Sequence, residues 1–383
     1  MTEIRTVTRW LMAVALFSGA VLSVSGEPVG RIVYLEGIVD IHRDGVVFEL
    51  FDDDVGMDIF NQDLISTGSD GVLELELTAY ANPGTIVKVA EKTAFYLDFS
   101  RHMGNARTDL PLLAGSLSFK VQRLTGSEEL NVRTQSAIAG VRGTDFEVIT
   151  APEGSILVVC SEGRVSCEDD QYNKQYAQAG RVVEKRSGET LRRIDVDPGD
   201  ENLYRNFWIN QREQVFKAGA QVFVKAYALQ YQSHLAKFTE AYKKVATHRG
   251  VLELYGREVQ DYSSDLLLIY NEVSKDIIPS RGIFNLFEQI FYSLKTLQDY
   301  HAQGFGVTDI SRNLNSVAFF AEFLSYEPVL RGQLAEMHYY YKLFANISAS
   351  ASPAGGSLMG DIFSGSSPLG SGIPQSGLGN NSN

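Results

Sequence analysis

The chain has few cysteines, few histidines and fewer basic than acidic residues, and each shortage argues against a class of function. Two cysteines and six histidines occur among 383 residues, and the histidines show no His-Glu-x-x-His or comparable spacing of metal ligands. Lys and Arg number 34 against 47 Asp and Glu, which gives a formal net charge of −13. Nucleic-acid phosphates are bound by clustered Lys and Arg. We therefore expect no nucleic-acid partner, no metal and no other cofactor.

Recognisable catalytic motifs are also missing. The nucleophile elbow Gly-x-Ser-x-Gly is absent from the region expected to fold, and Gly304-Phe305-Gly306 lacks the third glycine and the βαβ setting of a dinucleotide site. The acidic runs Asp52–Asp54 and Glu168–Asp170 lack the alternating ligands of a calcium loop. We interpret both as solvated acidic turns, with a calcium role left open for the second. The protein is expected not to be an enzyme.

The only long apolar run lies at the N-terminus. Arg5 and Arg9 precede the apolar segment Trp10–Val24, and Val24-Ser25-Gly26 supplies small residues typical of a cleavage site. Residues 1–26 are therefore predicted to be a signal peptide. Removal is favoured over retention as an anchor, because the run is shorter than the roughly 20 residues of a membrane span. No later stretch is apolar enough for a bilayer, so we expect a periplasmic or secreted protein.

The central region has the pattern of a β domain. From Val29 to about Val196 the dominant period is two, and Gly71–Leu77 alternates apolar with acidic residues as a half-solvated strand does. Similar short runs recur with Gly, Asn or Asp between them, and Pro83-Gly84 marks a clear turn. Residues 27–196 are therefore predicted to form an all-β sandwich or roll.

The pattern changes at Asp197-Pro198-Gly199-Asp200, where proline and glycine end the strands and Asp200 is suited to cap a helix. Residues 197–347 are predicted to form an α-helical bundle with long amphipathic helices, so the fold class is α+β by domain. About five helices are expected, over Glu201–Thr247, Val251–Ile278, Ile283–Ala302, Asp309–Tyr326 and Val329–Ile347. Pro279 is expected to close the second, and Glu327-Pro328 to separate the last two.

Two features of the C-terminal half leave alternatives open. The many tyrosines and phenylalanines of the helices are interpreted as packing residues, with an aromatic binding groove as the alternative. Residues 348–383 consist mainly of Ser, Gly, Pro and Asn and are predicted to be a disordered tail. Within it, Leu358–Phe363 is interpreted as incidental apolar sequence, with a short docking motif as the alternative.

The two cysteines flank a predicted hairpin turn. Cys160 and Cys167 stand on either side of Ser161-Glu162-Gly163-Arg164. A turn centred on Glu162-Gly163 would make them diagonal neighbours about 7–8 Å apart, near or beyond the disulfide limit, whereas a turn centred on Gly163-Arg164 would place them directly opposite. A disulfide and a pair of free thiols are both left open.

Four glycines are predicted to be turn residues. Gly140 and Gly143 bracket an arginine just before an alternating strand, Gly68 lies in a polar hairpin tip, and Gly163 lies between the cysteines. Glycine tolerates positive φ and close backbone approach at such positions.

The candidate partner-binding surface lies around Arg142, Thr144 and Asp145. An arginine in such a turn can meet a partner carboxylate in a bidentate pair. The alternative, an arginine that fastens its own turn, is favoured slightly over this role.

The β region resembles the extracytoplasmic FecR domain, which is named for the iron-dicitrate sensor regulator. The segments that carry the resemblance are, in order, Asn61–Leu75, Leu113–Leu117, Gly140–Val148 and Val158–Val165. Gln62 stands where the family usually has glycine. The resemblance covers roughly residues 29–185 and implies an extracytoplasmic β domain. It does not extend to the regulator architecture, in which a cytoplasmic anti-sigma segment and a transmembrane helix precede the domain.

The leading hypothesis is a non-enzymatic periplasmic scaffold. Its β domain would bind an envelope protein or a cell-wall polymer, and its helices would assemble with a partner, including a second copy of the chain. The alternative is an accessory component of extracytoplasmic signalling, which relays the occupancy of an outer-membrane receptor through a separate membrane protein. An enzyme acting on the cell wall is the weakest alternative, because no motif supplies a nucleophile, a base or a metal site. It stays open because carboxylates distant in sequence can still converge.

Overall fold

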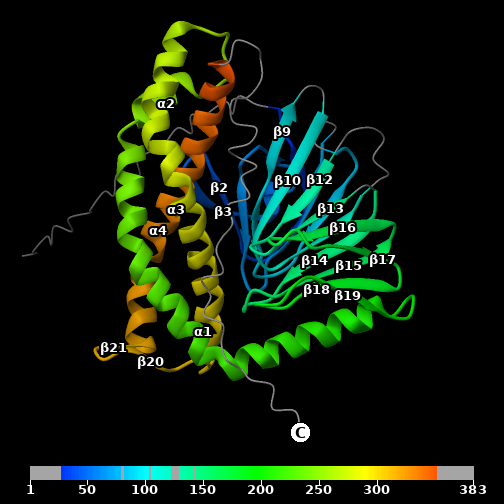
Figure 1. Ribbon diagram of the computed structural model, residues 1–383. Helices are drawn as coiled ribbons and strands as arrows, with labels where there is room; N and C mark the ends of the chain where they lie inside the picture. The colour runs from blue at the N-terminus through cyan, green and yellow to red at the C-terminus, as the bar shows by residue number, and fades with distance from the viewer. Residues whose placement is uncertain (1–26, 79–81, 103–104, 122–128, 142, 352–383) are drawn as a thin grey trace, which may run out of the picture.

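The computed structural model describes residues 27–78, 82–102, 105–121, 129–141 and 143–351. The predicted signal peptide and residues 352–383 of the predicted tail lie outside the described residues. Within the described ranges, no helix combines the length and apolarity that a membrane crossing requires. Strands come first along the chain and helices second, which confirms the predicted α+β fold class (Figure 1).

The described β region contains nineteen strands and the short 3-10 helix η1. Their bounds are β1 Gly30–Glu36, β2 Val39–Arg43, β3 Val46–Leu50, η1 Asp52–Asp54, β4 Asp58–Ile59, β5 Leu64–Thr67, β6 Val72–Leu77, β7 Ile86–Val89, β8 Ala94–Tyr96, β9 Asp98–His102, β10 Asn105–Ala114, β11 Ser116–Lys120, β12 Glu129–Arg133, β13 Ala137–Val141, β14 Asp145–Thr150, β15 Ile156–Glu162, β16 Arg164–Asp169, β17 Lys174–Gln178, β18 Arg181–Lys185 and β19 Arg192–Asp195.

The strands wrap around one apolar core. One path of pairings runs β1–β6–β7–β11–β14–β15–β18, and a second runs β10–β12–β13–β16–β17 and returns to β18. A third path runs β10–β8–β5–β2–β3. The β10–β12 pair is parallel, and the other pairs in these paths are antiparallel. The result is a roll rather than an open sheet.

The alternation predicted for β6 is confirmed by burial. Leu73, Leu75 and Leu77 are buried in the core, while Glu74 and Glu76 point outward. Because successive side chains of a strand point to opposite faces, this pattern fixes which face of β6 meets the core. Each buried leucine of this kind stabilises the fold by about 2 kcal/mol.

The helical region contains three long helices, one short helix and a two-stranded hairpin among its described residues. Their bounds are α1 Glu201–Ala246, α2 Arg249–Tyr255, α3 Ser264–Ala302, β20 Asp309–Ser311, β21 Leu314–Asn315 and α4 Ser316–Ser350. The aromatic residues pack inside this region, as Phe238 and Phe287 do with ring centroids 4.2 Å apart. The interpretation of these rings as packing residues is confirmed. Helix α4 also continues past 348, where the tail was predicted to begin.

The prediction of five helices is wrong at both prolines. Pro279 lies inside α3 and Pro328 inside α4. An interior proline removes one backbone hydrogen bond and costs a helix about 3 kcal/mol. Burial on the following turns offsets this cost, because Phe284 and Phe287 of α3 and Leu330 of α4 are all buried in the helical core.

The predicted helix boundaries are also wrong in two places. The chain leaves helix at Gly256, where an added Cβ would lie 2.5 Å from the Leu343 carbonyl oxygen. It re-enters at Ser263, whose hydroxyl accepts a hydrogen bond from the Leu266 amide at 3.2 Å. Later, Asp309 begins a hairpin instead of a helix. The break at Gly256 is determined by close packing of the chain against α4, which the local sequence pattern cannot predict.

The start of α1 is fixed by a residue other than the predicted cap. The Asp200 side chain makes no capping hydrogen bond. Instead the buried Glu201 carboxylate accepts hydrogen bonds from the Gly180 amide at 2.7 Å and the Gly199 amide at 2.9 Å. These bonds join the end of the β region directly to the first helix and lower the pKa of Glu201.

The helices pack onto the β region at several points (Figure 1). The first part of α1 runs beside β18 and β19, and Trp208 is buried there against Leu157 of β15 and Val182 of β18. Further along α1, Phe216 belongs to the helical core instead. Helix α1 is continuous through Gly219, so this glycine does not interrupt it. The two regions therefore share packed interfaces and do not merely follow each other along the chain.

Candidate ligand cleft

The predicted partner surface is only partly described. Arg142 lies outside the described residues. Thr144 is 2% exposed, and its hydroxyl has no hydrogen-bond partner. Asp145 is half-buried at the start of β14, opposite Lys120 and Glu162. Thr144 is therefore removed from the candidate contact residues, because a buried side chain cannot meet a partner. The roles of Arg142 and Asp145 stay predictions.

The four predicted turn glycines have three different outcomes. Gly143 and Gly163 have φ of +69° and +82°, which L side chains rarely adopt. Gly68 instead permits a close approach, because its amide donates to the Ile38 carbonyl at 2.7 Å. The prediction is wrong for Gly140, which lies inside β13, where an added Cβ would sit 3.0 Å from Oδ1 of the neighbouring Asn131.

The two cysteines are free, buried thiols. The predicted hairpin does not form, because β15 pairs with β14 and β18 whereas β16 pairs with β13 and β17. Cys160 lies opposite Phe146, and Cys167 lies between Ala139 and Gln175. Burial raises the pKa of Cys160 to about 11 and that of Cys167 to about 12. Such thiols stay protonated and unreactive at neutral pH.

A cleft of about 500 Å³ lies between the β region and α3. Its β wall comes from β8–β10, β12, β13 and the end of β16, and its helical wall comes from α3. A second cavity of about 300 Å³ adjoins it, shares Leu112 and Ser136, and extends to Trp208 and Arg212 of α1. Volumes of this size are typical of small-molecule sites. The cleft is thus the candidate functional site.

Asp109 organises the charges on the β wall. Its carboxylate forms ion pairs with Arg107 at 3.1 Å and Arg133 at 2.9 Å, and it accepts a hydrogen bond from Asn131 at 2.9 Å. The parallel register of β10 and β12 places Asp109 directly beside Asn131. Burial raises the pKa of Asp109, and the hydrogen bond from Asn131 and the charge of Arg107 oppose that rise. Both guanidinium groups are therefore engaged by the wall itself.

Asp98 is a second carboxyl of the β wall with a raised pKa. Burial, reinforced by the negative charge of Asp109, raises the pKa of Asp98 to about 6. Its Oδ1 accepts a hydrogen bond from the Gln62 amide at 2.8 Å. Gln62 has φ of +67° and occupies the position where the resembling family usually has glycine. The side chain at this unusual position thus contacts the cleft carboxylate.

The helical wall presents a second buried polar pair. Glu288 of α3 and His338 of α4 are both buried and lie 2.6 Å apart between Oε1 and Nε2. The His338 ring meets Tyr96 of β8 edge to face at 4.8 Å. Arg281 of α3 stands over the Tyr341 ring at 5.1 Å. The cleft therefore reaches the contact between the β region and the helices.

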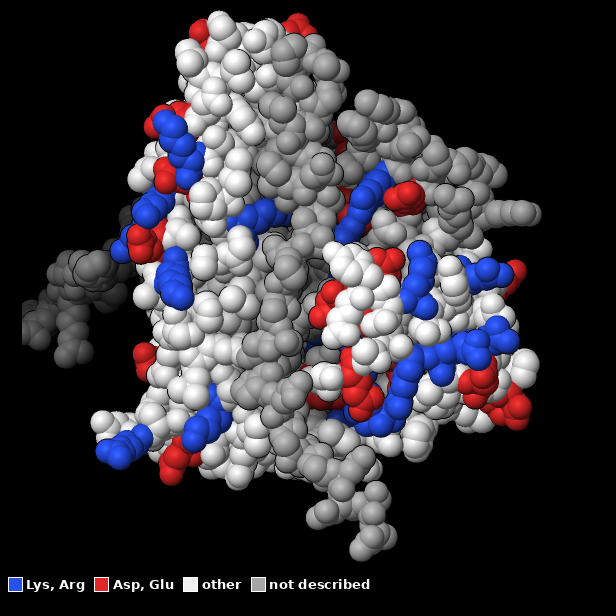
Figure 2. Space-filling model, viewed as in Figure 1, with Lys and Arg blue, Asp and Glu red and all other residues white. Residues whose placement is uncertain are grey.

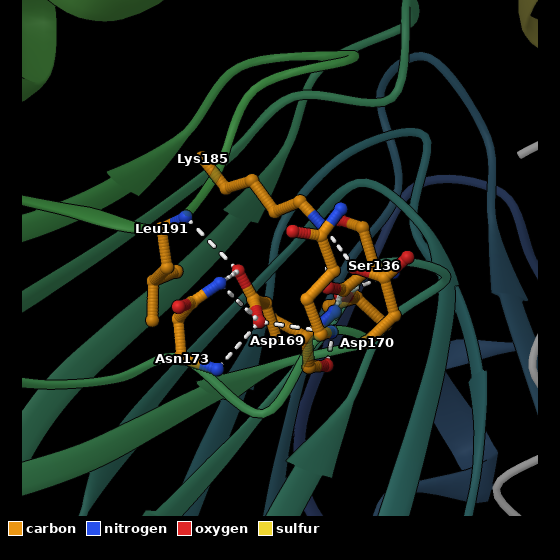
Figure 3. A network of polar contacts seen from close by, with 9 residues as sticks. Ser136, Asp169, Asp170, Asn173, Lys185 and Leu191 are labelled. Carbon is orange, nitrogen blue, oxygen red and sulfur yellow. Dashed lines mark hydrogen bonds and ion pairs between the residues drawn. The ribbon is translucent and has the colours of Figure 1, made fainter.

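The lip of the cleft is a turn built around Asp169 (Figure 3). The Asp169 carboxylate accepts hydrogen bonds from the Asn173 amide at 2.8 Å and the Leu191 amide at 3.1 Å. Burial would raise the pKa of Asp169, but these bonds and that of the Asn173 side chain lower it. Lys185 pairs with Asp170 and donates to the Ser136 carbonyl at 3.1 Å. The prediction of a solvated acidic turn is wrong for Asp169, because the turn uses it as a buried acceptor.

Charges of both signs are interspersed on the described part of this face, with no broad field of one sign (Figure 2). No group of three or more His, Cys, Asp or Glu in the described ranges is placed to hold a metal ion. The sequence draws attention to the acidic run Glu168–Asp170 but does not identify the cleft that this run helps to line. Its walls come from segments near 98–138, 168–172 and 281–293, and no local motif links them.

Most of the β wall lies within a segment that matches a known family. Residues 63–166 match the family described as FecR protein. The chain contains a FecR domain. This finding confirms the resemblance stated from the sequence, and the match includes Asp98, Asp109 and Ser136 of the cleft. The FecR match ends before α1, so the helical wall lies outside it.

Comparison with solved structures gives weaker likenesses. Two crystal structures of a proposed anti-sigma factor from Parabacteroides distasonis ATCC 8503, at 1.65 and 2.50 Å, match at 16% identity and a TM-score of 0.31. The matches cover 37% of this chain and 64% and 63% of the solved chains. The chain thus spans less than two thirds of their length. No curated protein matches the chain.

Proposed function

We propose that the protein is a non-enzymatic component of extracytoplasmic signalling, exported by its N-terminal segment, in which a ligand entering the cleft is sensed. The observation that carries this proposal is that one wall of the cleft lies mostly within the FecR match and the other comes from α3. The FecR match favours this alternative over the scaffold hypothesis. An envelope partner and self-assembly through the helices stay predictions.

The interface beside the cleft is suited to transmit a ligand's effect. Arg205 of α1 donates hydrogen bonds to both carboxylate oxygens of Glu147 of β14, with 2.7 Å from the guanidinium to Oε1. A second ion pair between the two regions joins Arg331 of α4 to Asp40 of β2 at 2.6 Å. A ligand that touches both walls stabilises the relative position of the β region and the helices in which it makes the most contacts. The free energy with which the ligand shifts this equilibrium equals the difference between its binding free energies for the two relative positions.

The polar groups of the cleft favour binding over catalysis. The Asp109 carboxylate is engaged by two arginines, and the Glu288 carboxylate by His338. A general acid or base must instead have a proton that it can exchange with substrate. Asp98 has a raised pKa, but its Oδ1 is already engaged by the hydrogen bond from the Gln62 side chain.

The experiment compares transcript levels in a deletion strain with those in deletion strains complemented with the gene. The proposal predicts that deletion changes a restricted set of transcripts and that the full chain restores them. A variant lacking residues 2–26 should fail to restore them, because it would not be exported. Unchanged transcripts accompanied by a loss of envelope integrity would instead support the scaffold hypothesis.

A further inference from the structure

An exposed tyrosine stands at the lip of the cleft in an uncommon backbone conformation. Tyr172 lines the cleft, is 80% exposed and has φ of +64°. A bulky residue in the left-handed region is strained by about 1–3 kcal/mol and persists only where its surroundings impose it. Here Asp169 imposes it, through the bonds to Asn173 and Leu191 and a further one from the Gln171 amide at 3.0 Å (Figure 3). The turn therefore holds an aromatic ring in solvent.

The carboxylates that line the cleft are already paired within the protein. Each described carboxylate of the lining has a partner: Asp98 has Gln62, Asp109 has Arg107 and Arg133, Glu168 has Lys174, Asp169 has backbone amides, Asp170 has Lys185, and Glu288 has His338. A ligand that carried a strong charge would have to compete with these pairs. The cleft is therefore better matched to a neutral ligand.

Among its described residues, the cleft also carries neutral hydrogen-bonding groups that have no partner within the protein. Ser136 on the β wall and Gln289 on the helical wall each carry a side-chain oxygen with no hydrogen-bond partner. Asn285, one turn before Gln289 on α3, adds a second side-chain amide to the same wall. Hydroxyl and amide groups donate and accept hydrogen bonds without charge. Buried polar atoms of this kind are normally paired, so these oxygens indicate a site for a hydrogen-bonding ligand.

We propose that the cleft binds a neutral saccharide. The apolar C–H face of one sugar ring stacks on Tyr172, as flat apolar surfaces do on aromatic rings, and sugar hydroxyls bond to Ser136 and Gln289. The inference rests on the proposed function only in taking this cleft as the sensing site. A volume of about 500 Å³ suits a short saccharide or the end of a longer glycan.

The test is calorimetric titration of the full chain with two neutral tetrasaccharides, of β-1,4-linked N-acetylglucosamine and of α-1,4-linked glucose, and with citrate as a charged probe. Co-sedimentation with insoluble chitin tests the polymer as the source. We expect a saccharide or the chitin to bind, with Kd below about 1 mM for a soluble one. Binding of citrate alone, or of none of the four probes, overturns the inference.

Three variants locate the binding. Tyr172→Gly should weaken it about tenfold without lowering Tm, because glycine accepts the positive φ. Gln289→Met should weaken it as well. Tyr176→Ala is the matched control: Tyr176 is 43% exposed on β17, stacks with Arg164 and does not line the described cavities. Equal binding by Tyr172→Gly and the native chain overturns the inference.

Binding and signalling can fail separately. Saccharide binding without any transcript response would leave this inference standing and contradict the proposed function. A transcript response without saccharide binding would do the opposite.

Discussion

Replacing Asp98 with asparagine should stabilise the protein at neutral pH and leave its stability nearly unchanged in acid. The folded state raises the pKa of this carboxyl from an ordinary 3.8 to about 6, mainly through burial and then through the charge of Asp109. A raised pKa favours folding while the group is protonated, and that contribution is lost as the pH rises from about 4 through 6. A difference of about 2 pKa units corresponds to at most about 3 kcal/mol at pH 7.5.

The assay is urea unfolding followed by circular dichroism at pH 7.5 and pH 4. Asparagine keeps an oxygen to accept the bond from Gln62, so the change mainly removes the charge. Asp109→Asn tests the second cause of the shift, because it removes the negative charge that raises the pKa of Asp98, so the gain from Asp98→Asn at pH 7.5 should be smaller when Asp109 is already asparagine. The reasoning fails if Asp98→Asn is less stable at pH 7.5, or gains equally at both pH values.

Three further substitutions test the fold around the cleft. Gly163→Ala should lower the free energy of unfolding by about 2 kcal/mol, because φ is +82° and the new Cβ would meet Thr144 Cγ2 at 2.4 Å; an unchanged Tm would contradict this. Arg205→Ala should cost about 1–3 kcal/mol by freeing Glu147, and hydrogen exchange should accelerate at the start of α1 rather than in α4. Gly332→Ala, where the added methyl meets nothing within 4 Å in mid-helix, should raise stability by about 0.5–1 kcal/mol in thermal unfolding.

Patterns with short periods could be read from the sequence. The alternation of Gly71–Leu77 determines which face of β6 is buried, and the proline and glycine near 198 mark the change from strands to helices. Both depend on interactions between residues close in the chain. The FecR segments added the order of strands and turns, which periodicity alone does not supply.

Features decided by distant contacts could not be predicted. Pro279 and Pro328 stay inside helices because packing against other helices outweighs a local cost. Gly140 was assigned to a turn, yet its neighbours Asn131 and Ser166 lie on adjacent strands. The cleft is the extreme case, because Tyr172 and its α3 wall are more than a hundred residues apart and no motif joins them.

The central claim, that the cleft between the FecR domain and α3 receives the signal, is tested most directly by filling it. Gly282 of α3 lines the cleft, and an added Cβ there would meet nothing within 4 Å, so Gly282→Trp should fold and occupy the entrance. Gly250→Trp in α2 has the same room for a Cβ and lies away from the described cavities. With transcripts measured in the complemented deletion strain, the account predicts that Gly250→Trp restores the native pattern and Gly282→Trp does not, at equal protein levels. Full restoration by Gly282→Trp would contradict it.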